Sequence, residues 1–285
     1  MSRFTKFLNR QAAGFCLHAL LAVMSVIWLL PIAWLVLNSL RLEKDPYIAY
    51  VLPKTFTLQN YVNLFTNTRL FNFPQWFLNT LIVAVFSCAV SALLILMISY
   101  ALSRLRFPAR RLYMNILLVL GMFPGFMAMV AVYHLLNLMN LTQTLTGLVV
   151  VYSSGAALTY YVAKGFFDTI PRSLDEAATL DGASKNTIFW RITLPMSKPI
   201  ITYTVILTFL APWVDFIFAN VIMRGKSEKW TVAVGLRNMI ERNNVLEYFT
   251  QFCAGIVVVS VPLVILFMFT QKNYVAGITS GSTKG

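Results

Sequence analysis

Charged residues are scarce in this sequence, and their scarcity excludes most water-soluble folds. Only 12% of the 285 residues are Asp, Glu, Lys or Arg, whereas 58% are hydrophobic. A soluble globular chain carries roughly one-quarter charged residues. The composition therefore predicts an integral membrane protein.

Cysteine and histidine are also few, and neither forms a pattern typical of a metal site. Cys16, Cys88 and Cys253 stand singly in or beside apolar runs, so no metal-ligand spacing and no disulfide framework is visible. His18 and His134 are separated from each other and from any cysteine pair. We therefore expect neither a metal nor a catalytic residue in this chain.

A complete phosphate-binding P-loop is lacking as well. Gly225, Lys226 and Ser227 match the end of that motif, but Asn220 stands where the motif requires a glycine. We therefore expect this chain to bind no cofactor and to have no ATPase activity of its own.

The formal net charge of +13 does not indicate a nucleic-acid partner. The basic residues lie in short clusters between apolar runs and form no continuous stripe and no patch interleaved with aromatics. Such clusters are typical of loops that contact anionic headgroups of membrane lipids. We expect membrane lipids, and no nucleic acid, among the partners.

Six apolar runs approach the roughly 20 residues that a helix needs to cross a bilayer. They span residues 15–37, 77–98, 112–133, 147–163, 200–223 and 253–269. We predict an all-α integral membrane protein with six transmembrane helices in a single domain over residues 1–285. The first run follows basic residues, as in a signal peptide, but it is too long and lacks a cleavage site, so we expect it to be retained.

The basic residues of the short loops predict the orientation. The second loop contains no acid and four arginines, namely Arg104, Arg106, Arg110 and Arg111. The third loop, residues 134–146, has no charge at all. Because positive loops stay on the cytoplasmic side, both termini and the second and fourth loops are predicted to be cytoplasmic.

Prolines and glycines interrupt the predicted spans. Pro31, Pro124, Pro212 and Pro262 each remove a backbone donor, although prolines are common in membrane helices. Pro124 lies between Gly121 and Gly125, which combines a kink with close backbone approach. We expect these three residues to line a translocation path.

Asp215 is the one acid inside a predicted span, and a carboxylate within the membrane by default indicates a functional site. A proton relay at this position would indicate a secondary transporter. However, no charged residue in another span is available as its partner. A structural hydrogen-bonding or pathway-lining role is therefore favoured.

The fourth loop predicts two short helices. Ser173 and Glu176 have the spacing of a capping box, so a helix should begin there. Gly182 should interrupt this helix, and Ser184 or Asp181 can cap a second one. From the pattern alone, the first helix could instead lie on the membrane surface as an amphipathic segment.

The same loop carries a sequence motif. It reads E-A-A, three residues, G, nine residues, I-x-L-P, and consists of Glu176, Ala177, Ala178, Gly182, Ile192, Leu194 and Pro195. It resembles the signature of permease subunits of binding-protein-dependent ABC importers. The segments K-G-F-F-D-T-I-P, P-W-V-D-F-I-F-A and Y-V-A-G-I-T-S-G-S-T-K-G are similar to the smaller permease subunits of maltose and maltodextrin importers. In related permeases the second of these segments, in the fifth span, often reads W-N-E-F where this chain has W-V-D-F.

This resemblance implies a type I ABC importer transmembrane domain with a cytoplasmic coupling helix in the loop of about residues 167–199. Glu176 would pair with a basic residue in a cleft of the ATPase, and Gly182 would form the bend. The C-terminal tail, residues 273–285 with Gly277, Gly281 and Gly285, would reach between the ATPase subunits. An outward loop would face the binding protein through Arg242, Asn243, Asn244 and Glu247.

The implied partners are a second permease subunit in a heterodimer, two ATPase subunits that hold ATP and Mg, and an extracytoplasmic sugar-binding protein. The implied location is the bacterial inner membrane, and the implied substrate is an oligosaccharide. Maltodextrin comes first, followed by galacto-oligosaccharides, raffinose-type sugars and uronate oligomers. A proton- or sodium-coupled sugar carrier and a non-transporting membrane scaffold remain as alternatives.

Overall fold

The computed structural model describes residues 2–47, 49–122, 125–155 and 157–280, and side chains only within residues 14–272, without residue 126. Over these residues the regular elements are helices, with one isolated β-bridge between Arg41 and Phe56. The all-α fold class is therefore confirmed. The chain divides into two compact units, Met1–Phe71 with Asn238–Val258 and Asn72–Arg237 with Val259–Gly285, and we describe each unit by itself.

The connections between the helices vary in length, and the one between α1 and α2 covers residues 40–58. In chain order they are α1 (Ser2–Ser39), α2 (Gln59–Thr66), α3 (Phe73–Arg104), α4 (Arg110–Met122), α5 (Gly125–Leu138), α6 (Leu145–Ser153), α7 (Ala157–Thr169), α8 (Arg172–Leu180), α9 (Lys185–Ile188), a π-helical segment (Phe189–Thr193), α10 (Leu194–Met196), α11 (Lys198–Val214), α12 (Ile217–Ile222), a 3-10 turn (Ser227–Lys229), α13 (Val232–Met239) and α14 (Val245–Ser280).

Between three and six of the described helical segments could cross a membrane. Three single helices are long and apolar enough, namely Gly14–Ser39, Phe73–Arg104 and Val245–Lys272. Three bent helix pairs also qualify, with bends of 108° between α4 and α5, 43° between α6 and α7, and 83° before α11. Counting each pair as one span gives six.

The predicted spans differ from the structure in their continuity. The fifth predicted run, residues 200–223, is not one helix, because α11 ends at Val214 and α12 begins only at Ile217. The fourth run is divided between α6 and α7 at Gly155, which has a positive φ of 65°. Pro31, Pro212 and Pro262 lie inside helices that continue past them.

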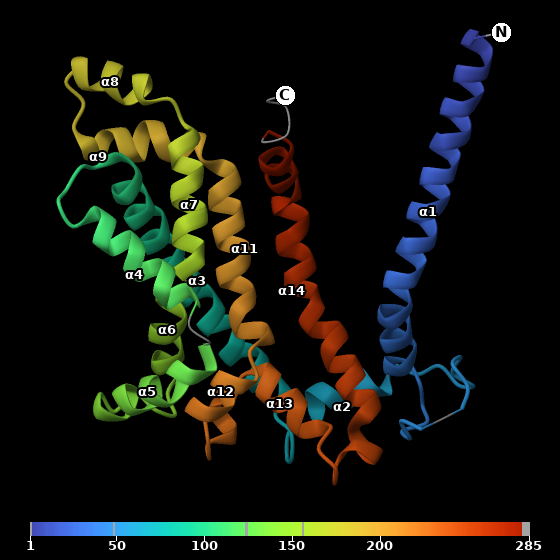
Figure 1. Ribbon diagram of the computed structural model, residues 1–285. Helices are drawn as coiled ribbons and strands as arrows, with labels where there is room; N and C mark the ends of the chain where they lie inside the picture. The colour runs from blue at the N-terminus through green and yellow to red at the C-terminus, as the bar shows by residue number, and fades with distance from the viewer. Residues whose placement is uncertain (1, 48, 123–124, 156, 281–285) are drawn as a thin grey trace. The chain divides into compact units, whose positions relative to one another are not determined.

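Helices α3, α7 and α11 run side by side in the second unit, and α8 and α9 lie at one end of them (Figure 1). A buried aromatic and aliphatic cluster joins these elements. Tyr100 of α3 packs against Phe167 of α7 and Phe189 of the π-helical segment, with ring centroids 6.0 and 4.8 Å apart. The apolar core therefore reaches from the spans into the loop that follows α7.

The other end of α3 is fixed by hydrogen bonds. The indole N–H of Trp76 donates to the carbonyl of Ser227, and the Asn79 amide donates to the carbonyls of Glu228 and Trp230. Trp76 is 1% exposed, and it packs directly on Gly235 of α13. The segment around the 3-10 turn is thus held against the start of α3.

The first unit has a polar centre. Asn60 donates to the carbonyls of Ser39 and Arg41, and its own carbonyl accepts from the Thr250 hydroxyl. Arg41, 3% exposed, donates to the carbonyls of Tyr50 and Val51. These bonds join α2, the loop after α1 and the start of α14.

Candidate functional site

The E-A-A motif lies on α8, a short amphipathic helix. Glu176 and Ala177 are exposed, whereas Ala178 is buried on the opposite side. The helix begins at Arg172 after Pro171, and no side chain caps it. The predicted capping box of Ser173 and Glu176 is therefore wrong: Ser173 already lies within the first turn, where its hydroxyl cannot occupy the N-cap position.

Gly182 ends α8 in a hydrogen-bonded turn. The N–H of Gly182 donates to the carbonyl of Thr179 at 3.1 Å, and the N–H of Ala183 donates to that of Ala178 at 2.9 Å. These two bonds define a Schellman motif, in which the residue after the C-cap adopts the left-handed conformation. Gly182 has a φ of +83°, which a glycine reaches without a steric penalty. The predicted interruption at this glycine is confirmed.

The second helix of the loop begins as predicted at Ser184. Its hydroxyl accepts from the N–H of Thr187 at 3.1 Å and caps α9. Ile188 and Phe189 then enter the core, at 0% and 5% exposure, while Trp190 remains 44% exposed.

The remaining motif residues lie where the chain turns into α11. Ile192 and Leu194 are half-buried, and Leu194 packs on the core cluster that contains Phe189. Pro195 is exposed within α10, directly before the 83° bend into α11. The structure thus gathers Glu176, Ala177 and Gly182 on the outer side of the loop, and turns Ile192 and Leu194 toward the spans.

A buried arginine fixes the loop to α3. Arg104 donates from its guanidinium to the carbonyls of Phe167 and Ile170 at 2.9 and 2.7 Å. Its Nε lies 3.4 Å from a carboxylate oxygen of Asp175 on α8, and the two side chains are only 4% and 15% exposed. Sequence analysis assigned Arg104 to the topology signal alone, because nothing in its spacing points to α8.

The outer face of the loop is open to a partner. Asp175, Glu176, Thr179, Leu180 and Lys185 line a depression of about 350 Å³. Leu180 is 89% exposed at the edge of this depression. The structure gives Glu176 no ion pair among the residues that it describes. A carboxylate beside an apolar side chain in a depression can receive a basic side chain of another protein.

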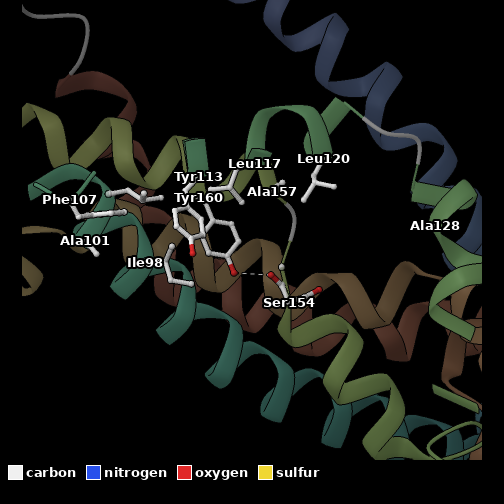
Figure 2. Close-up of a pocket in the computed structure, with 12 residues that line it drawn as sticks. Ile98, Ala101, Phe107, Tyr113, Leu117, Leu120, Ala128, Ser154, Ala157 and Tyr160 are labelled. Carbon is white, nitrogen blue, oxygen red and sulfur yellow. Dashed lines mark hydrogen bonds between the residues drawn. The ribbon is translucent and has the colours of Figure 1, made fainter. Parts of the chain in front are cut away.

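The glycines predicted to line a path lie in or beside α4 and α5. Gly121 approaches α7, where an added Cβ would meet that of Ala157 at 3.5 Å, and Gly125 faces open space. Pro124 lies outside the described residues. A cavity of about 700 Å³ lies between α3, α4 and α7 (Figure 2), but neither of these glycines is among its lining residues.

Two cavities meet at the break between α6 and α7. The larger is mostly apolar, and in it the Tyr160 hydroxyl donates to the carbonyl of Ser154 at 2.8 Å (Figure 2). The smaller, about 400 Å³, is also mostly apolar, but four of its lining residues carry hydroxyl groups, namely Tyr152, Ser154, Thr159 and Thr208, beside Val151, Gly155, Leu207 and Ala211. Hydroxyl groups are the donors and acceptors suited to a sugar, so the smaller cavity is the better candidate for a substrate path.

Asp215 lies beside this hydroxyl-lined cavity. It accepts a hydrogen bond from the Tyr152 hydroxyl at 2.8 Å with one oxygen and from the N–H of Phe218 at 3.0 Å with the other. The carboxylate thus links α6 to the break between α11 and α12. Sequence analysis found the acid but not Tyr152, since no periodicity relates the two positions.

The predicted outward loop forms an exposed turn before α14. Arg242 and Asn243 are exposed, Asn244 donates to the carbonyl of Asn238, and Glu247 lies 3.9 Å from Lys44. In the predicted tail, Gly277 belongs to α14, while Gly281 and Gly285 lie outside the described residues. No group of three or more His, Cys, Asp or Glu side chains that could hold a metal ion occurs within the described part of the chain.

Comparisons with known proteins agree with these features. Residues 95–279 match the family described as binding-protein-dependent transport system inner membrane component. The chain is 34% identical over 270 residues to the galactooligosaccharides transport system permease protein GanQ of Bacillus subtilis, covering 94% of each. It is 37% identical over 227 residues to the maltodextrin transport system permease protein MalD of Streptococcus pneumoniae, covering 79% of each.

A solved structure shares the fold. The chain superposes with a TM-score of 0.77 on a chain of a bacterial ABC transporter involved in the import of the acidic polysaccharide alginate. The match covers 95% of this chain and 98% of the other, at 23% sequence identity.

Proposed function

Because the chain belongs to the family of binding-protein-dependent transport system inner membrane components, as its E-A-A motif predicted, we propose that it forms half of the translocation pathway of an ATP-driven oligosaccharide importer. The family and the apolar helices assign it to the bacterial inner membrane as a multi-pass protein. Proteins of this family are transport components, and the ATP hydrolysis belongs to partner subunits.

The observation that carries the proposal is the exposed face of α8. Glu176 and Leu180 stand beside a depression, on a helix whose end is fixed by the turn at Gly182. An ATPase subunit that places a basic residue on Glu176 would form a charge-assisted hydrogen bond, strengthened by partial exclusion of water. The loop then acts as the coupling element between ATP hydrolysis and the spans.

The proposed assembly contains a second permease subunit, two ATPase subunits and an external binding protein. Closure of the ATPase subunits, which hold ATP and Mg, would move the coupling loops and switch the pathway from inward- to outward-facing. The turn at Arg242–Glu247 would face the binding protein, and the C-terminal tail would reach the ATPase subunits. This assembly requires six spans with both termini in the cytoplasm, so that α8 and the tail face the ATPase subunits and the turn at Arg242–Glu247 faces outward.

The proposed substrate is an oligosaccharide, with a maltodextrin first. The relatives support this class, since their names specify galactooligosaccharides and maltodextrin. The hydroxyl-lined cavity beside Tyr152 supports it physically, because sugar hydroxyls require many donors and acceptors and few charges. Uptake of maltotriose, a galacto-oligosaccharide, raffinose and a uronate oligomer, compared in one reconstituted system, would identify the sugar.

The coupling assignment is tested with Glu176→Ala in the full complex. Losing a charge-assisted hydrogen bond of about 1.5–3 kcal/mol should weaken ATPase docking by about one to two orders of magnitude. The measurements are sugar uptake into proteoliposomes and recovery of the ATPase subunits in a pull-down from solubilised membranes. Glu228→Ala, an exposed acid on the 3-10 turn, is the matched control and should retain both.

Two further results bear on the proposal. The purified chain alone should hydrolyse no ATP, whereas the complete complex with loaded binding protein should. If Glu176→Ala imports sugar normally and retains the ATPase subunits, α8 is not the coupling element and the importer mechanism proposed here is wrong.

A further inference from the structure

Two residues of α3, four positions apart, contact the two halves of the coupling loop. Tyr100 packs on Phe189, which follows α9, with ring centroids 4.8 Å apart. Arg104 pairs with Asp175 in the first turn of α8 at 3.4 Å. Because residues i and i+4 lie on the same face of a helix, one face of α3 holds both halves of the loop.

Arg104 also fixes the end of α7. Two of its bonds go to the carbonyls of Phe167 and Ile170 at the end of α7, and the first of these carbonyls also accepts from the Ile170 N–H. A guanidinium suits this position because its planar fork carries five donors and stays charged. It lies at the negative end of the α7 dipole and reaches toward the start of α8, where Asp175 is favoured by the positive end of that helix.

This arrangement differs from a surface ion pair. Surface pairs contribute little, since water screens them and both side chains lose freedom. The Arg104 side chain is 4% exposed and that of Asp175 15%. Removing the carboxylate leaves the buried guanidinium charge with neutral carbonyl partners only. The contact therefore resists separation of α8 from α3.

We propose that Arg104 is a positioning residue that transmits the displacement of the coupling loop to α3, an inference that rests on the proposed function. Glu176, on the exposed side of α8, binds the ATPase, and Asp175, the residue before it, connects the same helix to Arg104. Movement imposed on α8 then moves α3 and the end of α7 together. The apolar contact of Phe189 with Tyr100 alone permits sliding, because dispersion contacts have little directional preference.

The test separates docking from transmission. Asp175→Asn keeps the size of the side chain and the carbonyl contacts of Arg104 but removes the charge. It is introduced into the complete importer in proteoliposomes, with the sugar that the unmodified importer takes up. The readout is sugar molecules imported per ATP hydrolysed, together with recovery of the ATPase subunits in a pull-down.

Asp175 borders the depression on α8, but its side chain is only 15% exposed and faces Arg104. Asp175→Asn should therefore retain the ATPase subunits and ATP hydrolysis while the transport ratio falls at least about fivefold, the lower end of ordinary coupling effects. Asp175→Glu, which keeps the charge, should recover most of the ratio. Glu228→Gln, which removes the charge of an exposed acid outside the coupling loop, is the control, and its ratio should stay at the unmodified value.

Two outcomes overturn the proposal. A transport ratio within twofold of the unmodified importer shows that the pair transmits nothing, and loss of the ATPase subunits shows that it serves docking instead. If Asp175→Asn does not accumulate in the membrane, Arg104→Lys, which keeps the charge but loses the planar fork, is judged by the same two criteria. Failure of the unmodified complex to import any sugar with ATP would count against the proposed function alone.

Discussion

The Tyr152 hydroxyl donates a hydrogen bond to Asp215 at 2.8 Å, joining two positions 63 residues apart in the sequence. The second oxygen of the same carboxylate accepts from the N–H of Phe218 at 3.0 Å, near the start of α12. The acid thus satisfies polar groups of α6 and α12 at the break where α11 ends. This geometry favours a structural carboxylate over a proton relay.

Asp215→Asn should leave sugar uptake within about twofold, since its amide can donate to Tyr152 while its carbonyl accepts from Phe218. Asp215→Leu should lower the amount of folded protein, because an unpaired, partly buried polar group costs about 1–3 kcal/mol. Uptake and membrane accumulation of both variants are measured with and without an ion gradient. Loss of uptake in the Asn variant, together with gradient-driven uptake in the original, would favour a proton- or sodium-coupled carrier.

Gly235→Ala should destabilise the protein, because a Cβ at this position would overlap the Trp76 indole. Overpacking of this kind costs about 1–3 kcal/mol. Gly165→Ala is the matched control, since a Cβ there meets nothing within 4 Å and alanine is the better helix former by about 1 kcal/mol. Thermal unfolding of the purified complex in detergent should show a lower midpoint for Gly235→Ala only. Equal midpoints would contradict the packing at Trp76.

Sequence patterns predicted the elements of the coupling loop better than the contacts that hold it. Gly182 and Ser184 were found because a C-terminal glycine and an N-terminal serine act through their own backbone neighbourhood. The capping box failed for a local reason, since the helix already starts at Arg172, directly after Pro171 and one residue before Ser173. The Arg104–Asp175 pair could not be predicted, because its partners are 71 positions apart in the sequence and no periodicity relates them.

The breaks in the helices of the predicted spans also could not be predicted from the sequence pattern. Hydropathy averages over a window, so it reports an apolar segment whether or not the helix is continuous. At Gly155 the positive φ and close contacts with Ile95 and Ser91 divide the fourth run. At Asp215 the extended backbone ends α11 inside the fifth run. Both breaks depend on tertiary partners in α3 and α6.

The predicted orientation can be tested with single cysteines in a variant without Cys16, Cys88 and Cys253. Ser227→Cys should react with a membrane-impermeant maleimide in intact cells, because its segment is exposed and predicted to face outward. Asn186→Cys should react only after permeabilisation. Asn186 is preferred to Ser184, whose hydroxyl caps α9. Labelling at Asn186→Cys but not at Ser227→Cys in intact cells would show that the predicted topology is inverted.

At Gly182, asparagine and aspartate, two substitutions of nearly equal shape, separate the effect of the backbone conformation from the effect of charge. An added side chain meets nothing within 4 Å, so the cost of Gly182→Ala is the left-handed backbone itself, about 1–2 kcal/mol. Asparagine tolerates that conformation better and should retain most sugar uptake. Aspartate has the same shape but adds an unpaired negative charge beside Asp181 at the negative end of the α8 dipole, which is costly to bury against a partner, and should abolish uptake while the chain still inserts.

The measurement for this series is uptake together with pull-down of the ATPase subunits, normalised to the amount of chain in the membrane. The expected order of uptake is Gly, Asn, Ala and then Asp. A difference between Asn and Asp isolates electrostatics, because their backbone preferences are similar and their volumes nearly equal. If Asn fails as completely as Asp, the turn tolerates no side chain and its role is conformational; if Asp works as well as Asn, this bend is not buried against the ATPase.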